Sequence, residues 1–238
     1  NPMAEQQVNQ TNQVPNQTLE APKPPTPIVP APSEIVLPIT YVSTEGILVR
    51  NLPTESDWFV KQRNSPVISG ERLASPYPFV GKLDVGETRE VHLRLMGGTS
   101  LSVQGGGEAD ATPIKYVIHQ GQVVIQAGPG MPAMGYPLQM GTRTANWKLE
   151  LLTPDTRCGI SIVPRFSDQP KRVFAQDGFT GDLFVLQGAV RLSTDSKVLV
   201  VSSSHKLSLA TTDLMSHVPG VAGEKFNEIP EWLDPNIR

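Results

Sequence analysis

Cysteine and strongly basic segments are both scarce in this chain of 238 residues. Its single cysteine, Cys158, excludes an internal disulfide and a cysteine-rich metal site. Lysine and arginine number 20 against 23 aspartate and glutamate residues and form no basic run, so the chain lacks the positive surface that binds a phosphate backbone. We therefore expect no nucleic-acid partner.

Long apolar runs and aromatic side chains are also few. No stretch approaches about 18 consecutive apolar residues, so we expect any membrane segment to lie outside this chain. Aromatic residues make up 6% of the chain, whereas 23 prolines and 20 glycines interrupt it too often for a bundle of helices. The composition favours one or two compact domains with little helix.

Residues 1–33 differ in composition from the rest of the chain. They are rich in Asn and Gln and then in Pro, and they contain no Gly. Such a segment has little to bury and favours extended polyproline II where proline dominates. It predicts a disordered, Pro-rich N-terminal tether that ends near Ser33.

Residues 34–212 alternate between apolar and polar side chains and are broken by turn residues at a spacing of roughly 8 to 12 residues, as in β-sandwiches and barrels. This pattern predicts an all-β domain, built as a β-sandwich or a short solenoid-like body. Residues 213–238 leave the pattern, and we expect a C-terminal strap or linker that docks through Phe226, Ile229, Trp232 and Leu233.

An internal repeat covers residues 81–127 and 136–194. Leu83-Asp-Val-Gly86 recurs as Leu138-Gln-Met-Gly141, residues 91–96 recur as 147–152, and residues 117–125 recur as 184–192. We interpret this as two copies of one strand unit that share a core. Alternation then predicts that Leu93 and Leu149 face the same core, together with Val91, Leu95, Trp147 and Leu151, while His92, Arg94, Lys148 and Glu150 face outward.

Four glycines recur at matching places in the two copies: Gly86, Gly121, Gly141 and Gly188. Gly121 and Gly188 each separate two apolar strand halves, where a bulge or tight bend needs a residue without a Cβ. We predict a structural role for these four residues.

Four stretches in one order carry a family resemblance: residues 58–60 (Trp-Phe-Val), 68–75 (Ile-Ser-Gly-Glu-Arg-Leu-Ala-Ser), 91–99 and 117–123. They resemble the ferric-citrate regulator (FecR) domain family, and residues 147–162 with 184–192 look like the version found in planctomycete-type envelope proteins. The resemblance spans roughly residues 45–210. It departs from the family at Glu71, where Asp is usual, and the chain carries neither the anti-sigma segment nor the membrane helix of regulatory members.

Catalytic and metal-binding patterns are weak. His92, His119, His205 and His217 are far apart in sequence and fit no nucleophile or zinc signature, and we expect His92 and His119 to point into solvent. Cys158 is predicted to be a small buried hydrophobe. The acids Asp177 and Asp182 lack calcium-loop spacing, and residues 105–108 lack the lysine of a phosphate loop. We expect no catalytic residue, cofactor or metal.

Tyr77 and Phe79 are the candidate partner-binding residues, because Pro76 and Pro78 hold both aromatics in an extended loop. Burial at one end of the core is the favoured alternative for them. The resemblance implies an extracytoplasmic domain of the periplasm or cell envelope, tethered to a membrane, that binds another envelope protein and acts in signalling. The alternatives are a structural subunit that contacts copies of itself, and a carbohydrate-binding or carbohydrate-active β domain.

Overall fold

The structure is a computed structural model that describes residues 34–105, 113–165, 178–195, 197–209 and 223–234. Backbone contacts separate residues 1–33 from residues 34–238. The predicted tether lies outside the described residues. The described part contains seventeen strands and one short 3-10 turn, which confirms the all-β prediction. No helix in the described ranges is long and apolar enough to cross a membrane.

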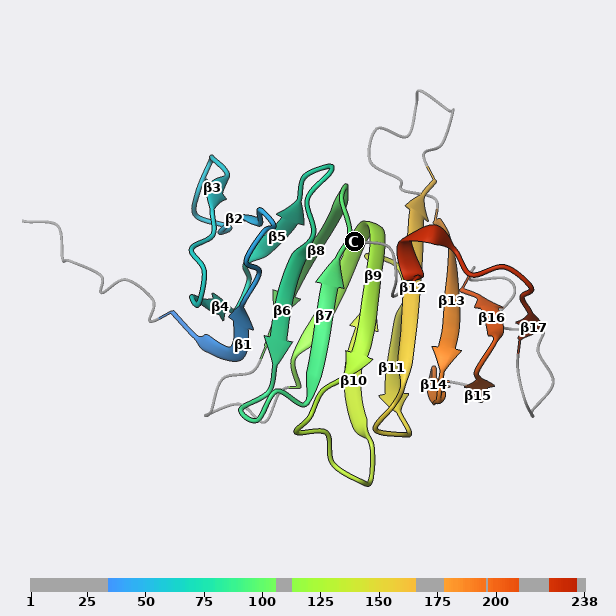
Figure 1. Cartoon of the computed structure of the whole chain (residues 1–238). Helices are drawn as coiled ribbons and strands as arrows, with labels where there is room; N and C mark the ends of the chain where they lie inside the picture. The colour runs from blue at the N-terminus through green and yellow to red at the C-terminus, as the bar shows by residue number, and fades with distance from the viewer. Residues whose placement is uncertain (1–33, 106–112, 166–177, 196, 210–222, 235–238) are drawn as a thin grey trace, which may run out of the picture. The chain divides into compact units, whose positions relative to one another are not determined.

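The strands form two ladders, which we call the first and the second sheet. The order in the first sheet is β4 (Pro66–Ile68), β1 (Val36–Tyr41), β6 (Gly81–Val85), β7 (Val91–Leu95), β9 (Lys115–Ala127), β12 (Arg157–Pro164), β13 (Phe179–Gln187), β16 (His205–Ser208) and β17 (Glu224–Lys225). Strands β6, β7, β9, β12 and β13 run side by side in Figure 1.

The order in the second sheet is β3 (Phe59–Val60), β2 (Val49–Asn51), β5 (Arg72–Ser75), β8 (Thr99–Gln104), β9, β10 (Tyr136–Gly141), β11 (Asn146–Leu151), β14 (Ala189–Ser193) and β15 (Val198–Ser202). All pairs are antiparallel except β9 with β10. Because β9 pairs in both sheets, the seventeen strands form one continuous hydrogen-bonded network.

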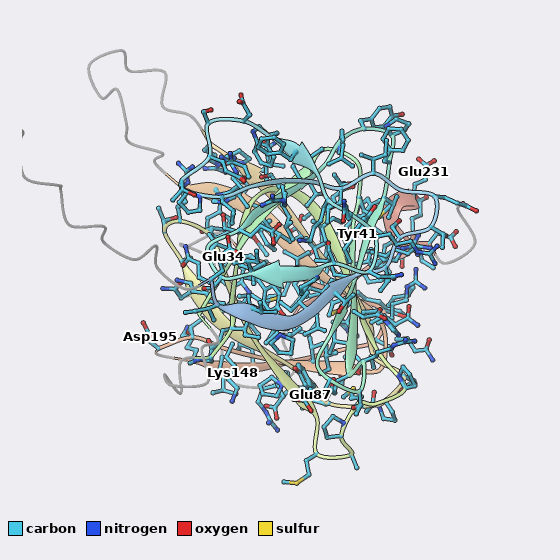
Figure 2. The ribbon with its side chains drawn as sticks, turned by 90° about the vertical axis from the view of Figure 1, so that its left-hand side faces the viewer. Glu34, Tyr41, Glu87, Lys148, Asp195 and Glu231 are labelled. Atoms are coloured by element: carbon cyan, nitrogen blue, oxygen red, sulfur yellow. The ribbon has the colours of Figure 1, made fainter. Side chains whose placement is uncertain are left out.

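One hydrophobic core is built from the inward side chains of both sheets, and these fill the space between the two layers (Figure 2). Val91, Leu93 and Leu95 on β7 and Trp147, Leu149 and Leu151 on β11 are all buried, and Lys148 lies at the outside. The predicted register of these strands is therefore confirmed.

The two repeats have the same path through the sandwich, with the sheets exchanged. In the first, the hairpin β6–β7 lies in the first sheet, β8 and the first half of β9 lie in the second, and the chain then returns beside β7. In the second, β10–β11 lie in the second sheet, β12–β13 lie in the first, and β14 returns beside β11. Leu93 faces Ile125 across its ladder as Leu149 faces Leu192.

The glycines mark the turns of this path. Gly121 (φ +95°) and Gly188 (φ +72°) stand where the chain passes from one sheet to the other. Gly86 and Gly141 end the first strands of the two hairpins, but only Gly86 has a positive φ, because Gly141 is still paired with Asn146 in the ladder. The two apolar strand halves on either side of Gly121 form the single strand β9, which passes from one sheet to the other at this glycine.

The C-terminal strap is described for residues 223–234. It ends in the turn η1 (Glu231–Leu233), whose Leu233 is fully buried. The ring of Trp232 lies edge-on to Phe184, with centroids 5.8 Å apart, and against Gly159 of β12. Phe226 also meets Phe184 edge-on. These contacts are made on the outer face of the first sheet, over β12 and β13.

Candidate functional site

A groove of about 630 Å³ opens on the outer face of the first sheet, over β6 and β7. Its walls are the loop 42–46 and residues 78–80, and its polar side chains include Lys82, Asp84, His92, Arg94 and Gln126. These side chains point away from the core because they alternate with the buried residues of β6, β7 and β9. We call this feature the Phe79 groove, after the aromatic residue in its wall.

Phe79 lies in the wall of the groove, and Tyr77 precedes the lining residue Pro78 without lining the groove itself. Tyr77 is 85% exposed and Phe79 is half-buried, so the favoured expectation that both are buried is wrong for Tyr77. The physical reason is a tight turn: the Phe79 amide donates to the Pro76 carbonyl at 2.8 Å, and the Ser75 hydroxyl donates to the Phe79 carbonyl at 2.8 Å. This turn fixes residue 79 against the sheet and leaves residue 77 at its tip.

The opposite wall is held rigidly against the chain that enters β6. The Ser43 hydroxyl donates to the Val80 carbonyl at 3.0 Å and accepts from the Gly46 amide at 3.1 Å. The Tyr41 hydroxyl donates to the Gly46 carbonyl at 2.7 Å. A Cβ at position 46 would lie 1.8 Å from the Val80 carbonyl oxygen, so the two walls are in close contact here. The groove is therefore formed before any ligand binds.

Asp84 is already engaged at the floor of the groove. Its Oδ1 lies 2.7 Å from His92 Nδ1, and its Oδ2 lies 3.4 Å from Arg89 Nε. His92 does point away from the core as expected, although the side chain is half-buried and paired. The Ser43 hydroxyl, which also lines the groove, is bonded to Val80 and not to His92. This arrangement binds and orients charge and does not assemble a nucleophile with a base.

His119 and Cys158 lie away from the groove. His119 does not point freely into solvent: its Nε2 lies 2.7 Å from the Ser102 hydroxyl, and its Nδ1 is shielded from water. Burial, and then the nearby Arg72 and Arg143, lower the pKa of His119 to about 4. Cys158 is fully buried, which confirms the prediction, and burial raises the pKa of its thiol to about 12.

The remaining candidates are scattered. His205 Nδ1 lies 2.9 Å from the Ser203 carbonyl, and Asp182 faces Ser161 and Ser208 across the ladder. Asp177, His217 and residues 106–108 lie outside the described residues. Within the described ranges, no group of three or more His, Cys, Asp and Glu side chains is placed to hold a metal ion.

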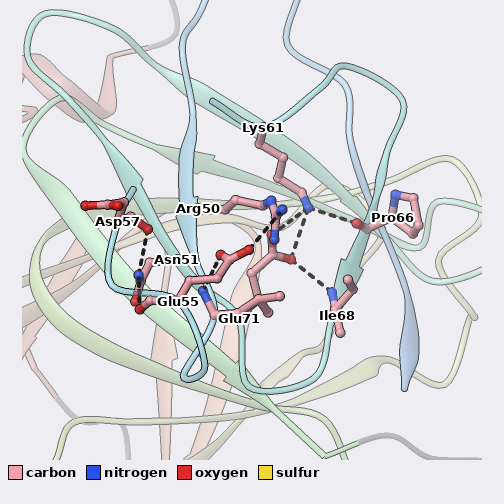
Figure 3. Close-up of polar contacts among 9 residues, drawn as sticks. Arg50, Asn51, Glu55, Asp57, Lys61, Pro66, Ile68 and Glu71 are labelled. Carbon is pink, nitrogen blue, oxygen red and sulfur yellow. Dashed lines mark hydrogen bonds and ion pairs between the residues drawn. The ribbon is translucent and has the colours of Figure 1, made fainter. Parts of the chain in front are cut away.

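A buried ion pair escaped the sequence-based reasoning. Lys61 Nζ lies 2.8 Å and 3.0 Å from the two carboxylate oxygens of Glu71, and both side chains are almost completely buried (Figure 3). Lys61 also donates to the Pro66 carbonyl, and Glu71 accepts from the Ile68 amide. Every charge in this cluster is satisfied by the chain itself, so it is a structural clamp at the β2–β5 end of the sandwich.

The same end carries exposed apolar side chains on its edge strand. Trp58, Phe59 and Val60 are 43%, 47% and 69% exposed. Arg72 lies over the Trp58 ring at 5.5 Å and Arg50 over the Phe59 ring at 5.9 Å. β3 pairs only with β2 among the described strands, so one of its edges is open there.

Neither the models of known protein families nor the curated proteins contain a match to this sequence. The resemblance to the FecR domain family therefore stays a prediction from the motifs, and the proposals below rest on the geometry of the chain itself.

Proposed function

We propose that this chain is a non-catalytic protein-binding domain of the cell envelope, similar to FecR domains, that contacts another envelope protein through the Phe79 groove. The observation that carries the proposal is a preformed groove lined by Phe79, with the exposed Tyr77 next in sequence to the lining residue Pro78. Aromatic side chains at the centre of an interface contribute much of its binding energy. The sensor role in envelope signalling is part of this proposal.

The rigidity of the groove supports a binding role. Its walls are tied together by Ser43, Val80 and Gly46, so little conformational entropy is lost when a ligand enters. A ring that is 85% exposed is not needed for the core, because it buries almost nothing. Tyr77 is therefore free to take part in an interface at little cost to folding.

A photo-crosslinking side chain tests the proposal. We replace Tyr77 by p-benzoylphenylalanine in the full-length protein in its native cell, and Met134, which is 92% exposed and outside the groove, by the same residue as the control. We expect a discrete adduct with one protein from position 77 and none from position 134. The purified partner should then bind the wild-type chain and bind the Phe79→Ala variant much more weakly. Equal adducts from both positions, or binding that ignores Phe79, would contradict the proposal.

A structural role is the second candidate, and the edge strand β3 favours it. Open edges with exposed apolar side chains pair with other chains, and Trp58, Phe59 and Val60 provide such an edge. Native mass measurement tests this role. A structural subunit would form oligomers that Val60→Lys dissolves, whereas a monomer of the calculated 25.8 kDa at all concentrations argues against it.

A further inference from the structure

Two cations face each other across the floor of the Phe79 groove. Lys82 of β6 is directly opposite Arg94 of β7, and both side chains line the groove. Like charges at directly opposite positions of an antiparallel pair destabilise it. Within the described part of the chain, neither side chain lies within ion-pair distance of a carboxylate. The groove thus holds two positive charges that its own carboxylates leave uncompensated.

Arg94 in particular lacks acceptors. Its Nε is shielded from water and has no hydrogen-bond partner among the described residues. Its neighbour Arg157, across the sheet, also has a buried Nε without a hydrogen-bond partner, but its Nη2 donates to the Leu233 carbonyl at 3.1 Å and Asp234 is close to it. A buried donor without an acceptor is costly, and Arg94, unlike Arg157, makes no other hydrogen bond to the described residues that would offset this cost.

The second repeat shows the same position with its charge satisfied. Glu150 lies between Leu149 and Leu151 as Arg94 lies between Leu93 and Leu95, so the two residues are structurally equivalent. Glu150 accepts from Arg191 of the neighbouring strand at 2.6 Å. The residue next to Arg94 on the corresponding strand is the apolar Val124. The fold therefore accommodates an ion pair at this position. The first repeat has the cation, Arg94, but no carboxylate beside it on the corresponding strand.

The groove's own carboxylates do not supply that half. Asp84 is held by His92 and Arg89, and Glu45 is on the exposed loop, without an ion pair to Lys82 or Arg94. The negative charges of Asp84 and Glu45 limit how much negative charge the ligand can carry. A phosphate dianion would be repelled by them more strongly than a carboxylate with one negative charge, and a carboxylate matches the planar fork of an arginine.

We propose that Lys82 and Arg94 bind a carboxylate of the partner protein, beside an apolar side chain of that partner that packs on Phe79. This inference rests on the proposed function and names the chemistry of the partner segment: an acidic group next to an apolar residue. Charge complementarity commits the site to an acidic protein segment, since the chain as a whole has no basic run that would recruit nucleic acid.

The Nε–Hε signal of Arg94 in the 15N-labelled full chain is the direct readout, assigned from its loss in Arg94→Lys. The probes are N-acetyl-Phe-Glu methylamide, its uncharged match N-acetyl-Phe-Gln methylamide, and inorganic phosphate. We expect a saturable shift with the glutamate peptide alone, and binding about tenfold weaker in Lys82→Gln. The control Lys148→Gln removes another exposed lysine, from the second repeat, and should leave the affinity unchanged.

Several results would overturn the inference: no shift with the glutamate peptide, an equal shift with the glutamine peptide, tighter binding of phosphate, or an equal loss in Lys148→Gln. Failure here is distinguishable from failure of the proposed function. An adduct from position 77 without carboxylate binding would support the protein-binding role and contradict only the acidic ligand. Carboxylate binding without an adduct would support the carboxylate site and contradict the protein-binding role.

Discussion

Thr99 and Thr156 hold the same place in the two repeats. The Thr99 hydroxyl donates to the Gln122 carbonyl at 2.9 Å, and the Thr156 hydroxyl donates to the Ala189 carbonyl at 3.2 Å. Each of these carbonyls belongs to the residue just after a glycine with positive φ, where the chain changes sheets. A buried threonine thus fixes each crossing between the two layers.

The glycines at these crossings should be hard to replace. A Cβ on Gly121 would lie 2.5 Å from Thr99 Cα, and a Cβ on Gly188 would lie 2.9 Å from Thr156 Cα, in addition to the cost of a positive φ. We expect Gly121→Ala and Gly188→Ala each to lower the free energy of unfolding by about 2 kcal/mol or more.

Gly98 provides the matched control, because its φ is +84° but no atom lies within 4 Å of the place that a Cβ would take. Gly98→Ala should cost only the backbone term, about 1 kcal/mol. Urea titrations followed by tryptophan fluorescence measure all three variants. A cost for Gly98→Ala as large as for the other two would show that the contact with threonine does not matter.

The register of β11 can be tested with two adjacent residues. Leu149 is fully buried and Lys148 is exposed, so Leu149→Asp places an unpaired charge in the core and Lys148→Asp does not. Leu149→Asp should lower the free energy of unfolding by several kcal/mol, on the order of the total stability of a domain. Lys148→Asp should leave it nearly unchanged. Thermal melting of both proteins decides, and equal melting temperatures are incompatible with the observed register.

Removing one partner of the buried pair Lys61–Glu71 should be worse than removing both. Lys61→Met leaves the Glu71 carboxylate buried without its cation, which costs about 3–5 kcal/mol. The double variant Lys61→Met/Glu71→Met should recover at least half of that loss, since no uncompensated charge remains. A double-mutant cycle from denaturant unfolding gives the coupling, and strict additivity would mean that the clamp does not act as a pair.

His119 predicts a loss of stability in mild acid. The pKa of its imidazole is lowered from 6.5 to about 4 by burial and by Arg72 and Arg143. Between pH 6.5 and 4 the unfolded chain therefore binds a proton that the folded chain does not, so stability falls as the pH falls through this window. Melting temperatures at pH 7 and pH 5 should differ less in His119→Gln than in the wild type. An NMR titration of His119 with a pKa near 6.5 would contradict this prediction.

Local alternation was sufficient to predict the parts of the fold that depend on neighbouring residues. Leu93, Leu149 and their flanking residues are buried or outward as the period of two requires. The bend at Gly121 was expected, but not that a single strand passes through it, because sequence alone does not say whether pairing continues across a glycine.

The site depended on contacts that alternation cannot show. Lys82 and Arg94 are opposed only because the turn between β6 and β7 sets their register, and Lys61 reaches Glu71 only through the path of the intervening loop. Tyr77 was expected in the core from the scarcity of aromatic residues, whereas the hydrogen bonds of one turn place it outside. The aromatic content of a chain indicates that some rings must be buried in the core, but it does not indicate which ones.

Hydrogen exchange of the full chain, alone and with the protein captured at position 77, tests the binding role of the Phe79 groove most directly. The groove predicts slower exchange in residues 42–46 and 78–80, which form its two walls, with no change in the equivalent hairpin β10–β11 of the second repeat. Protection confined to residues 58–60 or to β10–β11, with the groove walls unchanged, would contradict it.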